Sequence, residues 1–219
     1  MLRSGSTPIH IALLGDSTLD NGAYTSGGPA VIDHLSRLLP AGDRATLLAV
    51  DGATTQHIQS QLGRIPDGAT HVVLSIGGND AVREIGVLER PTQTVADALT
   101  KLSPVVERFE EAYRACLQQV LQAGLPTTVC TIYNGAFDEA RGEQQVIDAA
   151  LTMWNDAILQ AALDHRLPVI DLRRVCTSRD DFTRQIEPSE QGGRKIAEAL
   201  QRTFTEPELT STRIGPSGR

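Results

Sequence analysis

The sequence has no excess of positive charge: 20 lysines and arginines stand against 27 aspartates and glutamates, giving a formal net charge of −7. Proteins that bind nucleic acids usually carry a stripe of basic residues that contacts the phosphate backbone. No such cluster is present, so we expect no nucleic-acid partner. The chain also lacks an apolar run of membrane-spanning length, and we expect no signal peptide, because the Met1–Gly5 start has no apolar stretch long enough for one. We therefore expect no membrane span and a cytoplasmic location.

Cysteine is scarce as well. Cys116, Cys130 and Cys176 are odd in number and widely spaced, which excludes a regular disulfide framework and a zinc knuckle. We expect three reduced thiols that serve as small core residues.

The glycine-rich signatures of nucleotide-binding proteins are also missing. No Gly-x-x-x-x-Gly-Lys-Ser/Thr motif occurs, and no Gly-x-Gly-x-x-Gly follows the first strand. Nucleotide binding is therefore disfavoured.

What the sequence does contain is a regular alternation of apolar strands and helical patterns. Strands are predicted at residues 9–14, 45–50, 71–76, 127–133 and 167–172. The helical patterns lie at residues 29–39, 56–62, 95–121, 147–161 and 193–204. Such alternation predicts a parallel five-stranded sheet covered on both faces, an α/β fold of three layers.

The chain is long enough for one full core, since 219 residues include 40% hydrophobic ones. We expect a single domain over residues 1–205 and a mobile tail over residues 206–219, where apolar periodicity is lacking. Ser103-Pro104 is predicted to divide the long helix, with Pro104 opening its second half. Trp154 is predicted to be a core residue rather than a ligand platform.

Four of the predicted strands are followed by loops that hold candidate functional residues. Ser17 comes after the first, in Gly15-Asp16-Ser17, and Gly52, Asn79 and Glu187 come after the second, third and fifth. The carboxyl ends of parallel strands share one edge of the sheet, where open α/β sheets bind ligands. Each residue alone has an ordinary reading, as a turn or helix cap. Together they match acyl transfer, which needs a nucleophile and donors for the developing oxyanion.

These segments resemble a known family. Gly15-Asp16-Ser17-Thr18-Leu19-Asp20 resembles the first block of the GDSL, or SGNH, hydrolases, while Gly52 and Gly77-Gly78-Asn79-Asp80 resemble the second and third. The resemblance covers about residues 9–200 and implies a flavodoxin-like α/β/α fold. It also implies Ser17 as nucleophile and Ser17, Gly52 and Asn79 as oxyanion donors. Family members hydrolyse esters, thioesters or acyl groups on carbohydrates, so it implies a small-molecule ester substrate and neither a metal nor a cofactor.

The last block of the family departs from the pattern. The family has Asp, two residues, His and Pro, whereas this chain has Arg184-Gln185-Ile186-Glu187-Pro188. Glu187 thus occupies the position of the base and Arg184 that of the supporting Asp. An ordinary Glu has a pKa of about 4.3 against about 6.5 for His; burial would raise it, and a nearby Arg would lower it.

Three hypotheses follow from this departure. Glu187 is the general base toward Ser17, or His57, just past Gly52, takes that role. In the third, the site is catalytically silent and binds an acyl or sugar ligand or a protein partner.

The residues that follow the nucleophile are candidates for the substrate pocket. They are Asp20, Asn21 and Tyr24, together with Asp16, which is expected mainly to fix the loop through hydrogen bonds to its backbone. Asp180 and Asp181 precede Glu187 and are expected on a solvated surface.

Overall fold

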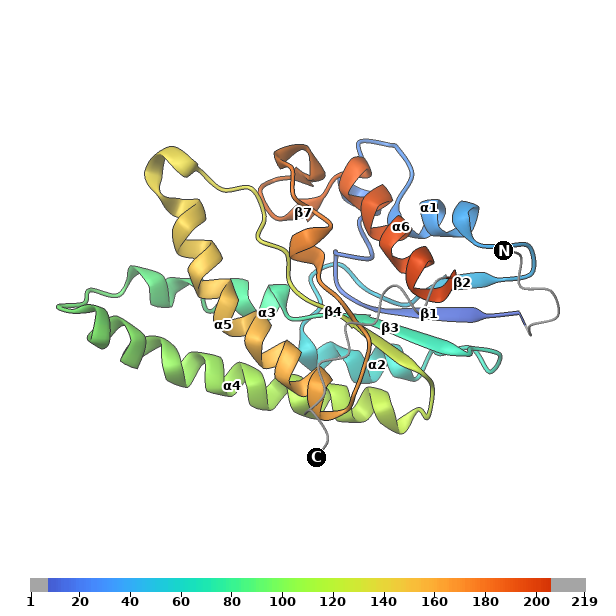
Figure 1. The fold of residues 1–219 in the computed structure, drawn as a ribbon, viewed down its shortest axis with the longest axis horizontal. Helices are drawn as coiled ribbons and strands as arrows, with labels where there is room; N and C mark the ends of the chain where they lie inside the picture. Colours follow the sequence, from blue (N-terminus) through green and yellow to red (C-terminus); the bar gives the residue numbers. More distant parts are fainter. Residues whose placement is uncertain (1–7, 206–219) are drawn as a thin grey trace, which may run out of the picture.

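Five parallel strands form the centre of the molecule, in the order β2-β1-β3-β4-β5 (Figure 1). They are β1 (His10–Gly15), β2 (Arg44–Leu47), β3 (His71–Ser75), β4 (Thr127–Cys130) and β5 (Val169–Ile170). The computed structural model describes residues 8–205, so the tail predicted at 206–219 lies outside the described residues. The predicted parallel sheet is confirmed, and its strand order is that of flavodoxin-like folds.

The register of strand pairing determines where each loop leaves the carboxyl edge of the sheet. In the register of β1 with β3, Gly15 pairs with Ser75, so both strands end at the same height. β1 also pairs in parallel with β2, with Leu13 opposite Leu47. The loops after β1, β2 and β3 therefore leave the sheet side by side.

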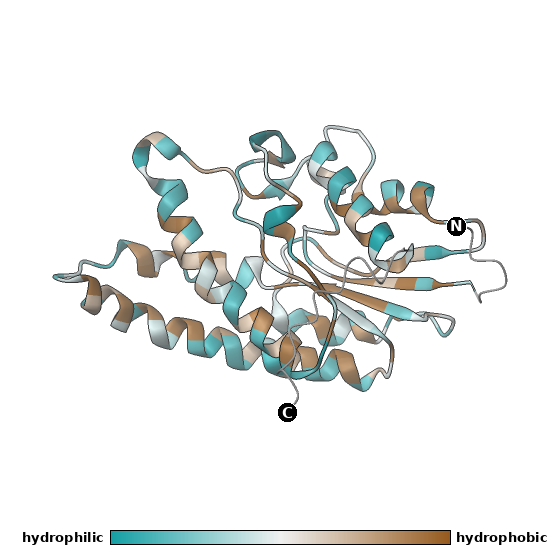
Figure 2. Ribbon diagram, viewed as in Figure 1, coloured by the Kyte–Doolittle hydropathy of each residue, from teal (hydrophilic) through white to brown (hydrophobic). Residues whose placement is uncertain are grey.

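Helices cover both faces of the sheet. On one face lie α1 (Val31–Leu38) and α6 (Glu190–Thr205); on the other lie α2 (Ile58–Leu62), α4 (Val95–Gln122) and α5 (Glu143–Asp164) (Figure 1). Ile11 and Leu13 pack toward the first pair, and Ala12 and Leu14 toward the other three. Successive side chains of a strand point to opposite faces, so a strand buried on both sides is apolar throughout, as Figure 2 shows for the central strands.

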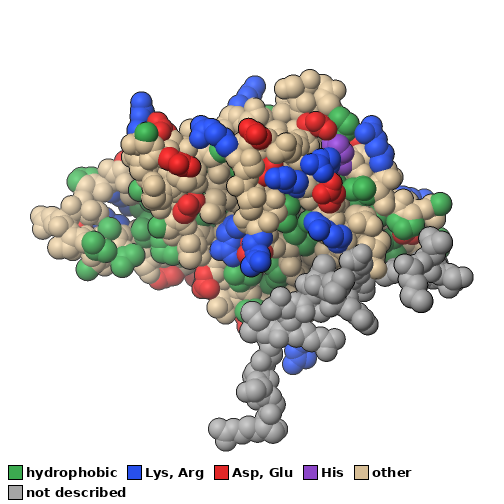
Figure 3. All heavy atoms as spheres, turned by 45° about the horizontal axis from the view of Figure 1, so that its top comes forward, with side chains coloured by type: hydrophobic (Ala, Val, Ile, Leu, Met, Phe, Trp, Pro, Cys, Tyr) green, Lys and Arg blue, Asp and Glu red, His purple; other side chains and the backbone are tan. Residues whose placement is uncertain are grey.

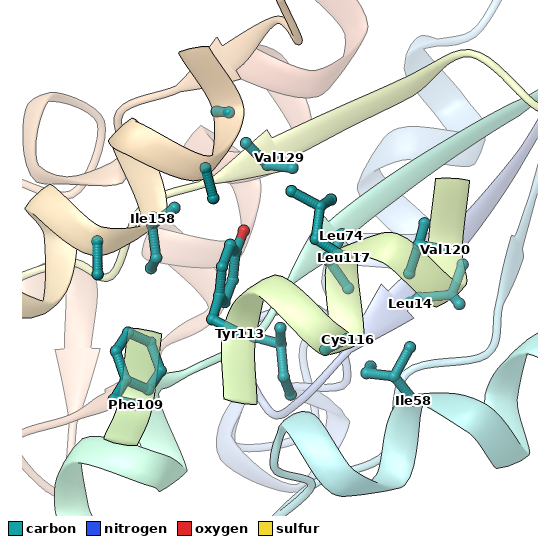
Figure 4. Packing of buried hydrophobic residues seen from close by; sticks show 14 of the residues in the cluster. Leu14, Ile58, Leu74, Phe109, Tyr113, Cys116, Leu117, Val120, Val129 and Ile158 are labelled. Atoms are coloured by element: carbon teal, nitrogen blue, oxygen red, sulfur yellow. The ribbon is translucent and has the colours of Figure 1, made fainter. Parts of the chain in front are cut away.

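The larger core cluster lies between the sheet and α4 and α5. Phe109 and Tyr113 of α4 reach toward Ile158 of α5 and Leu74 of β3 (Figure 4). The rings of Phe109 and Tyr113 are 5.8 Å apart. Trp154 belongs to the same cluster and is 3% exposed, which confirms its predicted place in the core.

The long helix α4 is continuous, so the predicted division at Ser103-Pro104 is wrong. Pro104 cannot donate a backbone hydrogen bond to the carbonyl of Thr100, but both residues lie on the exposed side, where water can bond that carbonyl. Ser103 does not cap a new helix; its hydroxyl donates to Glu107 at 2.7 Å. The buried residues of α4 all follow Pro104, beginning with Val105, and Leu102 before it packs against the same core cluster.

Several short elements complete the described chain. After β3 come α3 (Gly78–Arg83) and the 3-10 helix η3 (Ile85–Glu89), and an antiparallel hairpin joins β6 (Phe182–Thr183) to β7 (Glu187–Pro188). Single 3-10 turns are η1 (Gly22–Tyr24), η2 (Thr55–His57), η4 (Glu139–Arg141), η5 (Leu172–Arg174) and η6 (Arg179–Asp181). None of α3, η3 and the hairpin was expected from periodicity.

The three cysteines are free and buried, as expected. Burial raises the pKa of each thiol to about 12. Within residues 8–205, no helix is both long and apolar enough to span a membrane. On the face seen in Figure 3, Lys and Arg side chains are interspersed with Asp and Glu.

Candidate active site

The turn that carries Ser17 is fixed at the end of β1. Gly15 has a φ of +146°, and a Cβ there would lie 1.9 Å from the carbonyl oxygen of Ser75, so only glycine fits. Gln61 of α2 accepts from the Gly15 N–H and donates to its carbonyl, both at 2.8 Å. Ser17 therefore leaves the sheet from a backbone with little freedom, and its side chain is 7% exposed.

Asp16 is buried beneath this turn. Its Oδ1 accepts from the N–H of Thr18 at 3.0 Å, which confirms the expected role of fixing the loop. Burial raises the pKa of Asp16 to about 7; the charges of Glu187 and Asp80 add to the rise, and hydrogen bonds from Thr18 oppose it. The carboxyl group also lines the pocket described below.

Asn79 stands in the first turn of α3 and links two loops. Its Nδ2 donates to the Ala53 carbonyl at 2.9 Å, and the next residue, Asp80, accepts from the Thr55 hydroxyl at 2.7 Å. Gly77, with a φ of +123°, brings the backbone against Phe109, where a Cβ would lie 3.0 Å from the ring. The loops after β2 and β3 are thus joined, and half-buried Asn79 faces the pocket.

Gly52 lies at an exposed turn with a φ of +76°. Two predicted pocket residues hold this turn: Asp20 accepts from the Asp51 N–H at 3.0 Å, and the Tyr24 hydroxyl donates to the Asp51 carboxylate at 2.7 Å. Neither Gly52 nor these two residues is among those that line the pocket. Asp20 and Tyr24 tie the first loop to the second instead.

Asn21 does not line the pocket either; it is fully buried between the loop of Ser17 and neighbouring backbone. Its Oδ1 accepts from the Val31 N–H at 2.8 Å, at the start of α1. Its Nδ2 donates to the carbonyls of Pro188 at 3.1 Å and Ser189 at 3.3 Å. Asn21 therefore connects the loop of Ser17 to the segment of Glu187.

Glu187 begins β7, on the far side of a tight hairpin. Arg184 and Gln185 in its turn have φ values of 48° and 70°, a left-handed conformation unusual for residues with a Cβ. The Gln185 carbonyl accepts from the Ala136 N–H at 2.7 Å, and the Ile186 carbonyl accepts from the Tyr133 hydroxyl at 2.6 Å. These contacts secure the turn from which Glu187 points into the pocket.

Glu187 is half-buried and lines the same pocket as Ser17. Burial is the largest influence and raises the pKa of Glu187, and the charge of Asp51 raises it further. The hydrogen bond from Ser17 and the charge of Arg184 act in the opposite direction without cancelling the rise. Its Oε2 is buried with no hydrogen-bond partner among the described residues.

His57 is held away from the site. This exposed residue lies in η2, where its Nδ1 accepts from the Thr54 N–H at 3.0 Å. Among the described residues that line the pocket there is no histidine. Glu187 is therefore the base candidate that the fold brings to Ser17.

Asp181 is not on a solvated surface, so that expectation is wrong. It is fully buried at the base of the hairpin, 2.7 Å from the Lys195 ammonium group, and it accepts from Gln191 and from the Ser178 N–H, both at 2.9 Å. Burial raises the pKa of Asp181, but the hydrogen bonds from Lys195, Gln191 and Ser178 outweigh it and lower the pKa overall. The residue braces the hairpin against α6.

One pocket brings together Ser17, Asn79 and Glu187, whose loops are far apart in the sequence. A sequence model of the GDSL-like lipase/acylhydrolase family matches residues 13–195. The chain belongs to this family.

Solved structures of GDSL-like and related esterases have the same fold. An extracellular lipase from Streptomyces rimosus superposes with a TM-score of 0.66 at 19% identity, over 88% of this chain and 98% of that one. A phospholipase A1 from Streptomyces albidoflavus NA297 gives 0.64 at 21% identity, over 89% and 98%. An acetylxylan esterase from Geobacillus stearothermophilus, solved as a catalytic mutant, gives 0.64 at 16% identity, over 97% and 100%. A comparison with the sequences of curated proteins finds no match.

In this GDSL-like chain, sequence reasoning missed most of the pocket wall. Val82, Ile85 and Leu88 line it from α3 and η3, and Ile147 and Leu151 line it from α5. Val82, Ile85 and Leu88 follow the third family block, but their spacing matches neither the period of a strand nor that of a long helix. Their apolar character was the one feature of the sequence that could have indicated a pocket wall.

Proposed function

We propose that the chain hydrolyses carboxylic esters, including acyl-esters, thioesters or acetylated carbohydrates, with Ser17 as nucleophile and Glu187 as general base. The observation that carries the proposal is that Ser17, Asn79 and the half-buried Glu187, from three separate loops, line one pocket. Membership of a family of lipases and acylhydrolases supports the reaction class.

In the first half of the reaction, the Ser17 Oγ attacks the ester carbonyl carbon while Glu187 accepts the Oγ proton. The tetrahedral intermediate collapses, the bond to the alcohol oxygen breaks, and protonated Glu187 returns its proton to the leaving alcohol. Water then attacks the acyl-serine, giving its proton to Glu187, and the carboxylic acid leaves as the Ser17 hydroxyl is restored. Burial aids Glu187 in this cycle because it makes the carboxylate a stronger base.

The oxyanion requires hydrogen-bond donors placed in advance. We assign this role to the backbone N–H of Ser17 and to the side-chain amide of Asn79, which line the pocket. The backbone N–H of Gly52, the third donor that the family resemblance implies, belongs to an exposed turn outside the pocket lining. The Asn79 amide has two hydrogens, and the bond to Ala53 uses one of them. Gly52 leaves open space where a side chain would stand.

The alternative function is ligand binding without catalysis. It is favoured by the absence of a histidine among the described pocket residues and by Arg184, whose charge stabilises ionised Glu187 and so weakens it as a base. A silent site would bind an acyl or sugar ligand, or a protein partner, without turnover.

Hydrolysis of p-nitrophenyl acetate by the parent and by Ser17→Ala separates the two functions. The proposal predicts turnover in the parent and loss to the uncatalysed rate in Ser17→Ala. Ser36→Ala is the control, because Ser36 is exposed on α1 and donates to the Ile32 carbonyl of its own helix. Equal turnover in the parent and Ser17→Ala would refute the proposal, and binding without turnover would establish the alternative.

A further inference from the structure

The pocket beside Ser17 continues into an apolar channel. Its walls include two segments: Val82, Ile85 and Leu88 come from α3 and η3, and Ile147 and Leu151 come from α5. Most of the channel surface is therefore hydrocarbon. A hydrocarbon chain bound there would be shielded from water along its length.

The channel wall beyond the strand end is rigid. Ile132, which follows β4 and lines the channel, is held through both backbone groups by Asn155 of α5. Its N–H donates to Asn155 Oδ1 at 2.7 Å, and its carbonyl accepts from Nδ2 at 2.9 Å. Asn155 is fully buried, so this part of the wall is held in place by the fold itself.

The charges that line the pocket have one sign. Asp16, Glu84 and Glu187 are its charged residues, and no described Lys, Arg or His lines it. The guanidinium group of Arg184 stacks over the Tyr24 ring, 5.5 Å from its centre, and Tyr24 is not part of the lining. The nearby cations already face lining carboxylates, since Arg108 lies 3.6 Å from Glu84 and the charge of Arg184 acts on Glu187. An acyl group that ends in a carboxylate would be desolvated beside acidic groups, with no cation among the described lining residues.

The apolar surface reaches the mouth of the channel. Val82 and Ile85 line it and are also 43% and 46% exposed. A chain longer than an acetyl group can therefore remain in contact with hydrocarbon as it extends from Ser17.

We infer that the preferred substrate carries an uncharged, apolar acyl chain of several carbons, bound between η3 and α5, rather than an acetyl or a dicarboxylic acyl group. This inference rests on the proposed function of Ser17. Each methylene that enters the channel should raise kcat/KM about fourfold. This is the ratio that corresponds to the free energy of moving one CH₂ group from water into an apolar environment.

The first test is kcat/KM for p-nitrophenyl acetate, butyrate and hexanoate, each divided by the rate constant of its hydroxide-catalysed hydrolysis. We expect a rise of roughly 10²-fold from acetate to hexanoate by the same ratio. The p-nitrophenyl monoester of adipic acid, which adds a terminal carboxylate to a chain of hexanoate length, should fall at least tenfold below hexanoate. A preference for acetate, or equal rates for the adipate and hexanoate esters, would overturn the inference.

The second test narrows the channel. Leu151→Trp should lower hexanoate turnover at least tenfold and change acetate turnover little, whereas Leu163→Trp, on an exposed position near the end of α5, should leave the ratio unchanged. Because Leu151 is half-buried, Ile85→Asp at the exposed mouth provides an independent variant with the same expected selectivity. An unchanged hexanoate-to-acetate ratio in a folded Ile85→Asp variant would contradict the inference.

These results remain distinct from failure of the proposed function. Ser17-dependent turnover with a preference for acetate refutes the channel assignment alone. Absence of Ser17-dependent turnover on every ester refutes the proposed function, and the channel assignment with it.

Discussion

Replacing Glu187 by Gln tests whether the carboxylate acts as a base. Glutamine keeps nearly the same shape and can still hydrogen-bond to the Ser17 hydroxyl, so the geometry of the pocket is preserved while proton acceptance is lost. General-base catalysis contributes about 10²–10⁴-fold. We expect kcat/KM of Glu187→Gln to fall by that factor, which is about 3–5 kcal/mol in transition-state free energy.

The pH profile makes this prediction specific. Burial raises the pKa of Glu187 above its ordinary value, and the base must be ionised to accept the Ser17 proton. Parent kcat/KM should therefore rise with pH through the raised pKa and then level off. Glu187→Gln should lose this dependence, because the titrating carboxyl is gone.

The assay is hydrolysis of p-nitrophenyl acetate from pH 4 to 9. Glu190→Gln is the matched control: it removes the same charge three residues away, from an exposed side chain 3.4 Å from His34 and outside the pocket lining. Its profile should match the parent. Glu187 would be refuted as the base if Glu187→Gln kept more than a tenth of parental kcat/KM while Ser17→Ala was inactive. The base would then be His57 or water.

Three further outcomes follow from the structure. Asn79→Ala should lower kcat for p-nitrophenyl acetate by ~10²–10³-fold with little change in KM, as loss of an oxyanion donor does; a rise in KM alone would instead assign Asn79 to substrate binding. Asp16 has a pKa of 3.8 when unfolded and about 7 when folded, so the native state binds more protons between those values and stability falls as pH rises through them. Asp16→Asn should remove up to about 4 kcal/mol of that fall. The prediction would be contradicted if the free energy of unfolding, measured with urea from pH 4 to 7, fell equally steeply with pH in the parent and in the variant. Pro104→Ala should stabilise the protein by about 2 kcal/mol in urea unfolding, because alanine can donate to the Thr100 carbonyl; no gain would show that the helix is distorted there already.

The ends of the strands could be predicted because their chemistry is local. A buried run that stops at Gly15-Asp16-Ser17, and Gly77-Gly78-Asn79 after another, identify the carboxyl edge without any knowledge of packing. Once the strands are parallel, these loops must converge. The meeting of Ser17 and Glu187 follows from that topology.

Other features depend on contacts that no local pattern encodes. Pro104 disfavours a helix in isolation, but the helix continues through it into a segment whose buried face begins at Val105, with Leu102 packed on the same core. Asn21 and Asp181 look like surface loop residues, and only their distant partners, Pro188 and Lys195, show why they are buried. The channel wall at α3 and η3 is short and irregular, so periodicity could not reveal it.

Covalent labelling of Ser17 by a fluorophosphonate tests the central claim most directly, because only a serine activated by a base and oxyanion donors reacts quickly. The modified residue is located by mass spectrometry of the parent, Ser17→Ala and Glu187→Gln proteins. The account predicts stoichiometric modification of the parent at Ser17, none of Ser17→Ala, and labelling of Glu187→Gln at least a hundred times slower, in line with ~10²–10⁴-fold for a general base. A parent that does not react at Ser17, or a Glu187→Gln variant that labels at the parental rate, would contradict it.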